Sequence, residues 1–341
     1  MRDFPGFKKG INLGGWLSQS PLTKEHLDTF ITEKDLQAIA SMGADHVRLP
    51  VDYPLIETEN GATIEEGYNY IDHCVAWCKA NGLRMILDLH KTYGYAFGDA
   101  ANCGSFFENP KLQERFLSLW DKFAARYGRY DFIAFDLLNE IVDPNVSDVW
   151  NDLAARAVAR IRSIAPDTWI LIGGTCYNSI NTVKHILPPP DDKIVYSFHF
   201  YEPFLFTHQA AGWEKLMPKA FRVKYPLTAE EYLEIAKKEL NGNFTGIFRG
   251  MEPETVGTDM LDFLFKEAVS VAEERNVPLY CGEYGVINLA NAESALAWHR
   301  DIHEVFERYG IGRALWSYKK MDFGIVDAHY EEVMKELVKV L

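Results

Sequence analysis

The fold is indicated by short apolar stretches, among them HVRLPVD (46–52), RMILDLH (84–90) and KIVYSFHFY (193–201). Each is a nearly continuous run of apolar and β-branched residues with the length of one strand, and each is followed by a polar loop and a helical pattern. Continuous hydrophobicity is typical of strands that are buried on both faces of a parallel sheet. The stretches therefore predict parallel strands that helices cover.

Five more stretches share this character: GINLGGW (10–16), FIAFDLLNE (132–140), WILIGG (169–174), PLYCGEYG (278–285) and GRALWSYK (312–319). Between the strands, apolar residues at helical spacing predict amphipathic helices over 65–81 and 111–127. Eight strands that each precede a helix predict an α/β fold, a closed (β/α)8 TIM barrel. We expect one domain over residues 1–341.

One interval between strands is too long for a loop and a helix alone. About 85 residues separate the starts of the sixth and seventh strands. The interval predicts a small inserted subdomain over 203–257, with helices around 228–240 and 258–275. Because the βα loops of a barrel build its active face, we expect the insertion near that face. A peripheral surface decoration is the alternative.

The composition restricts the classes of partner. Among 341 residues there are 35 Lys and Arg against 49 Asp and Glu, which gives a formal net charge of −14. Such an acidic chain disfavours nucleic acid and anionic membranes as partners and fits a neutral or cationic ligand. Five cysteines are too few for a disulfide framework, so reduced thiols are expected.

The sequence contains neither a transmembrane stretch nor an apolar segment like that of a signal peptide. The predicted location is therefore the cytoplasm, or outside the cell if a leader preceded this chain. We expect a monomer.

Polar side chains interrupt the apolar stretches near their carboxyl ends. In a parallel barrel these ends meet at one face, and a buried polar group is costly unless it is paired or functional. The convergence predicts one site, formed by Arg48, His90, Asn139, Glu140, His199, Tyr201, Glu283 and Trp316.

Two carboxyl groups are central to this prediction. Glu140 and Glu283 belong to the fourth and seventh stretches, which lie across the barrel mouth from one another. Cleavage of a glycosidic bond requires two such groups, a protonated one to donate to the leaving oxygen and an ionised one to attack the anomeric carbon. Arg48 would favour the ionised form of its neighbour, while His199 and Tyr201 could hydrogen-bond the carboxyl groups.

The remaining polar and aromatic residues suit the binding of a sugar. Trp316 offers a flat face for a pyranose ring, and Asn139 can bind a sugar hydroxyl such as the 2-OH. Possible outer subsites, each equally explained by packing, are Asn12, Trp16, Phe206 and Trp213. Asp136 is expected to be a structural carboxylate in mid-strand. No metal site and no cofactor are expected. The segment 140–145 is expected to be a turn into the next helix, because it lacks the ligand spacing of a calcium loop.

Several motifs resemble those of glycoside hydrolase family 5, which belongs to a large clan of retaining barrel glycosidases. They are VRLP (47–50), LDLH (87–90), FDLLNE (135–140), SFHFY (197–201), YCGEYG (280–285) and ALWSY (314–318). The eight predicted site residues match the family's eight recurrent active-site residues in order, and the resemblance covers nearly the whole chain. More narrowly, GINLGGWLSQ (10–19) and HFYEPFLFTHQ (199–209) resemble a clostridial type of compact endoglucanase with an insertion after the sixth strand.

The resemblance implies double displacement, with Glu140 as acid/base, Glu283 as nucleophile and their carboxyl groups about 5–5.5 Å apart. It implies a retaining endo-β-glucanase that acts on β-1,4 bonds of soluble β-glucan polysaccharides or oligosaccharides, including cellulose derivatives and mixed-linkage β-1,3-1,4-glucan. The alternatives are a β-mannanase or glucomannanase, an exo-β-1,3-glucanase, a metal-dependent hydrolase that uses His90 and His199, and a non-catalytic glycan-binding barrel.

Overall fold

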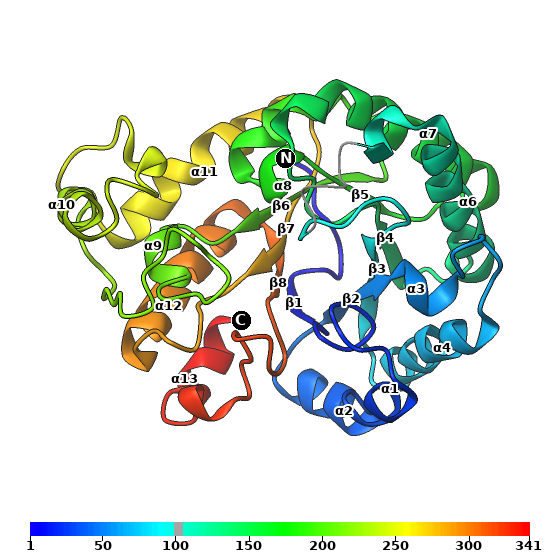
Figure 1. The fold of residues 1–341 in the computed structure, drawn as a ribbon, viewed down its shortest axis with the longest axis horizontal. Coiled ribbons are helices and arrows are strands. Elements are labelled where there is room, and N and C mark those ends of the chain that lie inside the picture. The colour runs from blue at the N-terminus through cyan, green and yellow to red at the C-terminus, as the bar shows by residue number, and fades with distance from the viewer. Residues whose placement is uncertain (99–104) are drawn as a thin grey trace.

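The computed structural model describes residues 1–98 and 105–341, and its strands form a closed parallel barrel in the order β1 to β8 (Figure 1). The strands are β1 (Lys9–Asn12), β2 (His46–Asp52), β3 (Arg84–Lys91), β4 (Ile133–Asp136), β5 (Ile170–Gly173), β6 (Ile194–Phe200), β7 (Leu279–Tyr284) and β8 (Gly312–Leu315). Pairing of Lys9 with Arg313 and of Ile11 with Leu315 closes the ring between β1 and β8. The predicted fold class is confirmed.

Helices surround the barrel (Figure 1). They are α1 (Lys24–Thr29), α2 (Glu33–Ser41), α3 (Tyr53–Ile56), α4 (Glu65–Ala80), α6 (Pro110–Tyr127), α7 (Ser147–Ile164), α8 (Thr175–Asn178), α9 (Phe204–Thr207), α10 (Ala229–Glu239), α11 (Gly257–Glu274), α12 (Ala292–Tyr309) and α13 (Met334–Leu337). Short 3-10 turns are η1 (Pro144–Val146), η2 (Ile180–His185), η3 (Gly246–Phe248), η4 (Ala328–Tyr330) and η5 (Val338–Val340). The helices predicted over 65–81 and 111–127 are α4 and α6.

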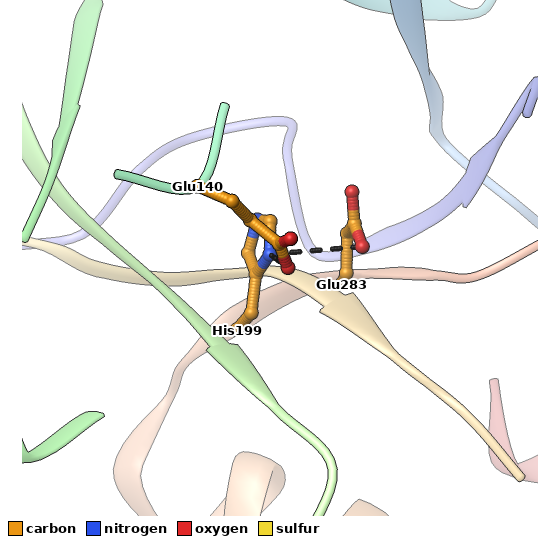
Figure 2. Close-up of side chains that lie close together, drawn as sticks. All are labelled: Glu140, His199 and Glu283. Atoms are coloured by element: carbon orange, nitrogen blue, oxygen red, sulfur yellow. Dashed lines mark hydrogen bonds and ion pairs between the residues drawn. The ribbon is translucent and has the colours of Figure 1, made fainter. Parts of the chain in front are cut away.

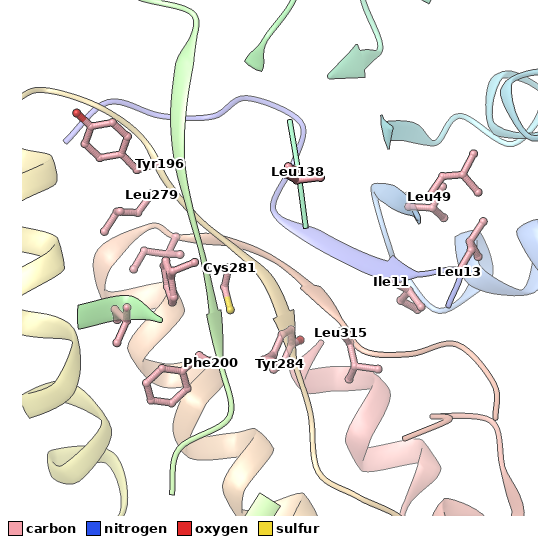
Figure 3. Packing of buried hydrophobic residues seen from close by; sticks show 14 of the residues in the cluster. Ile11, Leu13, Leu49, Leu138, Tyr196, Phe200, Leu279, Cys281, Tyr284 and Leu315 are labelled. Carbon is pink, nitrogen blue, oxygen red and sulfur yellow. The ribbon is translucent and has the colours of Figure 1, made fainter. Parts of the chain in front are cut away.

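Two apolar layers explain why the strands are continuously hydrophobic. Outward-facing side chains such as Leu49, Leu279 and Leu315 belong to the main buried cluster that packs under the helices (Figure 3). A second cluster near the amino ends of the strands combines Ile86, Ala134, Leu171, Val195, Tyr280 and Ala314 with Phe4 and Phe7 from the segment before β1. The bottom of the barrel is thus filled mainly with apolar side chains, although His46 at the start of β2 is buried there and is hydrogen-bonded to the hydroxyl of Tyr280 at 2.6 Å. The charged interior residues Arg48, Asp88 and Glu283 lie nearer the carboxyl ends of their strands.

The long interval after β6 contains α9, α10, η3 and α11. The helix predicted around 258–275 is α11, which has 18 residues and packs beside α12 as part of the helix ring. By contrast, α10 lies at the left margin of the molecule in Figure 1, outside that ring. That residues 203–257 form a subdomain of their own stays a prediction.

Three strands end earlier than the sequence indicated. The strand expected over 132–140 ends at Asp136, so Asp136 is its last residue rather than a mid-strand one. Similarly, β1 ends at Asn12 and β8 at Leu315. The chain then leaves the regular ladder, although loop hydrogen bonds continue, as from Asn139 N–H to Leu89 O at 3.1 Å. The residues that follow these strands are apolar, so the sequence pattern alone did not distinguish them from strand residues.

Within the described part of the chain, we find no helix long and apolar enough to cross a membrane. Cys74, Cys78, Cys176 and Cys281 are free thiols. Cys103 lies outside the described residues.

Candidate active site

A buried arginine organises the polar upper half of the barrel interior. Arg48 lies on β2 with 0% of its surface exposed. Its Nε donates to Asp136 Oδ2 at 3.0 Å, its Nη1 donates to Glu283 Oε1 at 2.9 Å, and its Nη2 lies 3.1 Å from Asp88 Oδ2. A charge removed from water is tolerated when such partners surround it. Burial opposes ionisation, but the charges of Asp88, Asp136 and Glu283 outweigh it and raise the pKa of Arg48.

Two asparagines complete the surroundings of this guanidinium group. Arg48 donates to Asn12 Oδ1 and to Asn139 Oδ1, each at 3.1 Å. Asn12 is itself fixed, because its amide donates to Gly282 O and to Ala314 O. The guanidinium group therefore connects strands from both sides of the barrel.

Glu283 is a strand residue whose carboxylate receives two hydrogen bonds. Besides Arg48, the hydroxyl of Tyr201 donates to Glu283 Oε2 at 3.0 Å. Tyr201 directly follows β6, the neighbour of β7. These donors orient the carboxylate and stabilise its negative charge.

Glu140 has a different environment. It lies in the loop four residues after the end of β4, with a left-handed φ of 42° that costs a non-glycine residue about 1–3 kcal/mol. Its side chain is only 13% exposed, and its Oε1 lies 2.8 Å from Nδ1 of His199. Burial raises the pKa of Glu140 to about 7, although His90 and Arg48 lower it. A carboxyl group with this pKa carries its proton in a large share of molecules at neutral pH.

The imidazole of His199 lies beside the carboxyl group of Glu140 and also approaches Glu283 (Figure 2). Its Nδ1 is 3.6 Å from Glu283 Oε2 in addition to its contact with Glu140. Burial lowers the pKa of His199 to about 4, more than the charge of Glu283 raises it. The imidazole is therefore neutral at neutral pH and can hydrogen-bond Glu140 in either protonation state.

His90 and Trp316 form an aromatic pair beside these residues. Their rings are parallel, with an interplanar angle of 3° and centroids 5.8 Å apart. Nδ1 of His90 lies 2.8 Å from Asp88 Oδ2. Burial lowers the pKa of His90, but this hydrogen bond and the charges of Asp88 and Glu283 together outweigh burial and raise the pKa above its usual value. With this pair, the structure brings all eight predicted site residues together through direct contacts or through Asp88.

The three central residues also have side chains of the types that bind metal ions. Glu140, His199 and Glu283 each offer an atom, and these atoms lie within 4.8 Å of one another. However, His199 Nδ1 and Glu140 Oε1 already pair with each other, and the cationic Arg48 is 2.9 Å from Glu283. A divalent cation would meet repulsion from that guanidinium group. The donor set therefore fits a pair of carboxyl groups in different protonation states better than it fits metal binding.

Three of the residues expected as outer subsites have no accessible side chain. Trp16 is 0% exposed, its Nε1 donates to Leu27 O, and its ring stacks on Trp77. Phe206 and Asn12 are fully buried as well. The packing alternative therefore accounts for these three side chains, because each is used in the core or in the Arg48 network.

Trp213 is different, since 55% of its surface is exposed. Its ring is 6.5 Å from that of Phe323, and the ring of Phe323 is 5.8 Å from that of Tyr201. His208, which also belongs to 203–257, contacts Tyr201 edge to face at 4.9 Å. The segment after β6 therefore adjoins the site.

Asp88 was missed in the sequence, although it contacts both Arg48 and His90. A signal was available: it is an acidic residue in an apolar strand, two positions before His90, so the two side chains share one face.

Comparison with known proteins identifies close relatives. The family model described as Cellulase (glycosyl hydrolase family 5) matches residues 9–322. Endoglucanase C of Acetivibrio thermocellus is 45% identical over 340 residues, which is 98% of each chain. Cellodextrinase A of Ruminococcus flavefaciens is 42% identical over 311 residues, covering 90% of this chain and 84% of that protein.

A solved structure agrees with the fold. The Clostridial cellulose synthase subunit Z of Clostridioides difficile superposes with a TM-score of 0.77 at 25% identity, covering 98% of this chain and 99% of the other.

Replacing Arg48 by Met should lower the free energy of unfolding by about 3–5 kcal/mol at pH 7, because three buried carboxylates lose their cation. Burial already raises the pKa of Asp136 to about 7 beside Arg48, and without that cation it would rise further. A carboxyl whose pKa is higher in the folded state destabilises the fold as pH rises, so R48M should regain stability as the pH falls from 7 to 5.

Denaturant unfolding of R48M at both pH values measures this effect. The control is R156M, which removes a side chain that is 40% exposed and pairs with Asp152. Equal losses in R48M and R156M, or a loss in R48M that grows on acidification, would contradict the central role of Arg48.

Proposed function

The chain belongs to glycosyl hydrolase family 5 and is a glycoside hydrolase, and on that premise we propose that it is a retaining endo-β-glucanase. The observation that carries the proposal is the separation of the two glutamates. One carboxylate oxygen of Glu140 and one of Glu283 lie within 4.8 Å of each other. Retaining glycosidases hold their carboxyl groups about 5–5.5 Å apart, whereas inverting ones need about 6.5–9.5 Å to admit a water molecule.

In the first step, the carboxylate of Glu283 attacks the anomeric carbon of the sugar. The carboxyl proton of Glu140 passes to the glycosidic oxygen, the bond from carbon to that oxygen breaks, and the leaving chain departs as an alcohol. The product is a glycosyl ester on Glu283. The hydrogen bonds from Arg48 and Tyr201 hold this carboxylate for attack.

In the second step, Glu140 acts as a base. Its carboxylate takes a proton from water while the water oxygen attacks the anomeric carbon, and the ester bond to Glu283 breaks. Both residues return to their starting protonation states. The neutral His199 supports both steps, since its Nδ1 can accept from protonated Glu140 or donate to the ionised form.

The substrate proposed is soluble β-glucan with β-1,4 bonds. The relatives at 42–45% identity carry the names endoglucanase and cellodextrinase, which favours a β-1,4-glucan. Trp316 and His90 would bind one sugar beside Glu283, and Asn139 would bind a sugar hydroxyl. The insertion 203–257 would extend the site, with the exposed Trp213 as a further subsite. A monomer suffices, because one chain supplies every residue named here.

Substitution of the two glutamates should separate their roles. E283Q should lose about 10⁴-fold or more in turnover of every substrate, because the attacking group is gone. E140A should lose turnover of β-glucan but keep kcat/KM on 2,4-dinitrophenyl β-cellobioside, because dinitrophenolate leaves without a proton.

Azide should accelerate the turnover of the dinitrophenyl substrate by E140A and yield the β-cellobiosyl azide. E239Q, at the exposed end of α10, is the control. Unchanged turnover in E283Q, or an α-configured azide, would refute the mechanism.

The pH dependence should follow Glu140. Because the acid must be protonated and burial raises its pKa to about 7, kcat/KM on β-glucan should fall as the pH rises through about 7. The measurement is kcat/KM from pH 4 to 9 for the wild type and for E140A on the dinitrophenyl substrate. If kcat/KM of E140A still falls as the pH rises through about 7, the fall must be assigned to the titration of another group.

A product profile tests the substrate class. Barley glucan and carboxymethyl-cellulose should be cleaved internally, with viscosity falling faster than reducing ends appear. Faster turnover of glucomannan would favour a mannanase, and release of glucose alone from laminarin would favour an exo-β-1,3-glucanase.

A further inference from the structure

The backbone on either side of Glu140 is held by a tyrosine from another loop. The hydroxyl of Tyr95, in the loop after β3, donates to Glu140 O at 2.7 Å. The same hydroxyl accepts a hydrogen bond from Val142 N–H at 3.0 Å. One oxygen atom thus connects two peptide groups that flank Ile141.

A third hydrogen bond comes from the loop after β5. The amide of Tyr177 donates to Ile141 O at 3.0 Å. Tyr177 is the middle residue of a left-handed turn in which Cys176, Tyr177 and Asn178 have φ angles of 52°, 59° and 53°. The peptide groups from Glu140 to Val142 are therefore fixed from both neighbouring loops.

Tyr95 is itself rigidly placed. Thr92 and Tyr95 exchange two backbone hydrogen bonds of 3.1 and 2.9 Å, and Gly94 closes this turn with a φ of 85°. The ring is 2% exposed and packs against Phe106 and Phe107 at 5.7 and 5.5 Å. The hydroxyl is thus presented to Glu140 at little cost in side-chain entropy.

We propose that Tyr95 is a positioning residue whose hydroxyl holds Glu140 in its left-handed backbone conformation and so aims its carboxyl group at the leaving oxygen. The need for such a contact follows from the fold, because Glu140 lies beyond the end of β4 and the strand ladder does not fix it. The inference rests on the proposed acid/base role of Glu140.

Loss of this contact should affect proton transfer more than the attack by Glu283. Glu283 lies on β7 and is held by Arg48 and Tyr201, neither of which touches Tyr95 in the hydrogen bonds described above. A small displacement of a catalytic group can cost about 100-fold in rate. A substrate whose leaving group needs no proton should be almost insensitive to the displacement.

The test uses Y95F, which removes the hydroxyl and keeps the ring. We expect kcat/KM on barley glucan to fall about 10- to 100-fold and kcat/KM on 2,4-dinitrophenyl β-cellobioside to fall less than about 3-fold. The control is Y196F, since Tyr196 is also fully buried, donates to Leu187 O at 2.7 Å and accepts from Arg275. It lies on the outer face of the barrel, so Y196F should leave the ratio of the two kcat/KM values unchanged.

Both substrates are assayed on the same preparation, so the ratio does not depend on the fraction of folded enzyme. A ratio in Y95F equal to that of the wild type, whether both activities fall together or neither falls, overturns the inference. If E140A itself leaves the ratio unchanged, the acid/base role fails instead, and the two failures are therefore distinguishable.

Discussion

The structure depends on the burial of the Arg48 guanidinium group inside the barrel. From β2 it contacts Asn12 on β1, Asp88 on β3, Asp136 on β4 and Glu283 on β7. A charge in the low-dielectric interior is costly unless every side is compensated, so these strands must keep their mutual positions for the cation to be tolerated. The constraint that stabilises the barrel interior is the same one that places the carboxylate of Glu283.

The polar layer also separates the two glutamates chemically. Glu283 accepts hydrogen bonds from a cation and a phenol, whereas the hydrogen-bond partner of the Glu140 carboxyl group is the neutral His199. Burial without a directly bonded cation raises the pKa of Glu140 to about 7. Two residues of the same type, a few ångströms apart, are thereby suited to opposite roles, which is the usual way in which acid and nucleophile are assigned in carboxylate pairs.

The barrel and its eight central residues could be predicted because buried parallel strands leave an unbroken apolar pattern, against which Arg48 or Glu283 stands out. The exposure of individual aromatic side chains could not be predicted from this pattern. Trp16 and Phe206 look like Trp213 in sequence, and only tertiary packing decides that the first two are buried and the third is exposed. The left-handed φ of Glu140 was equally hidden, since neither glycine nor asparagine marks the position.

The two glutamates are also fixed by different levels of structure. Glu283 is a strand residue, so the ladder between β6 and β7 and the bonds from Arg48 determine its place. Glu140 lies in a loop, so its place depends on contacts such as those of Tyr95 and Tyr177 with the peptide groups around it. A substitution in the loops after β3 or β5 can therefore displace Glu140, the proposed proton donor, while the carboxylate of Glu283 stays in place. Substitutions in the strands near Arg48 would act on Glu283, the proposed nucleophile, and on stability at once.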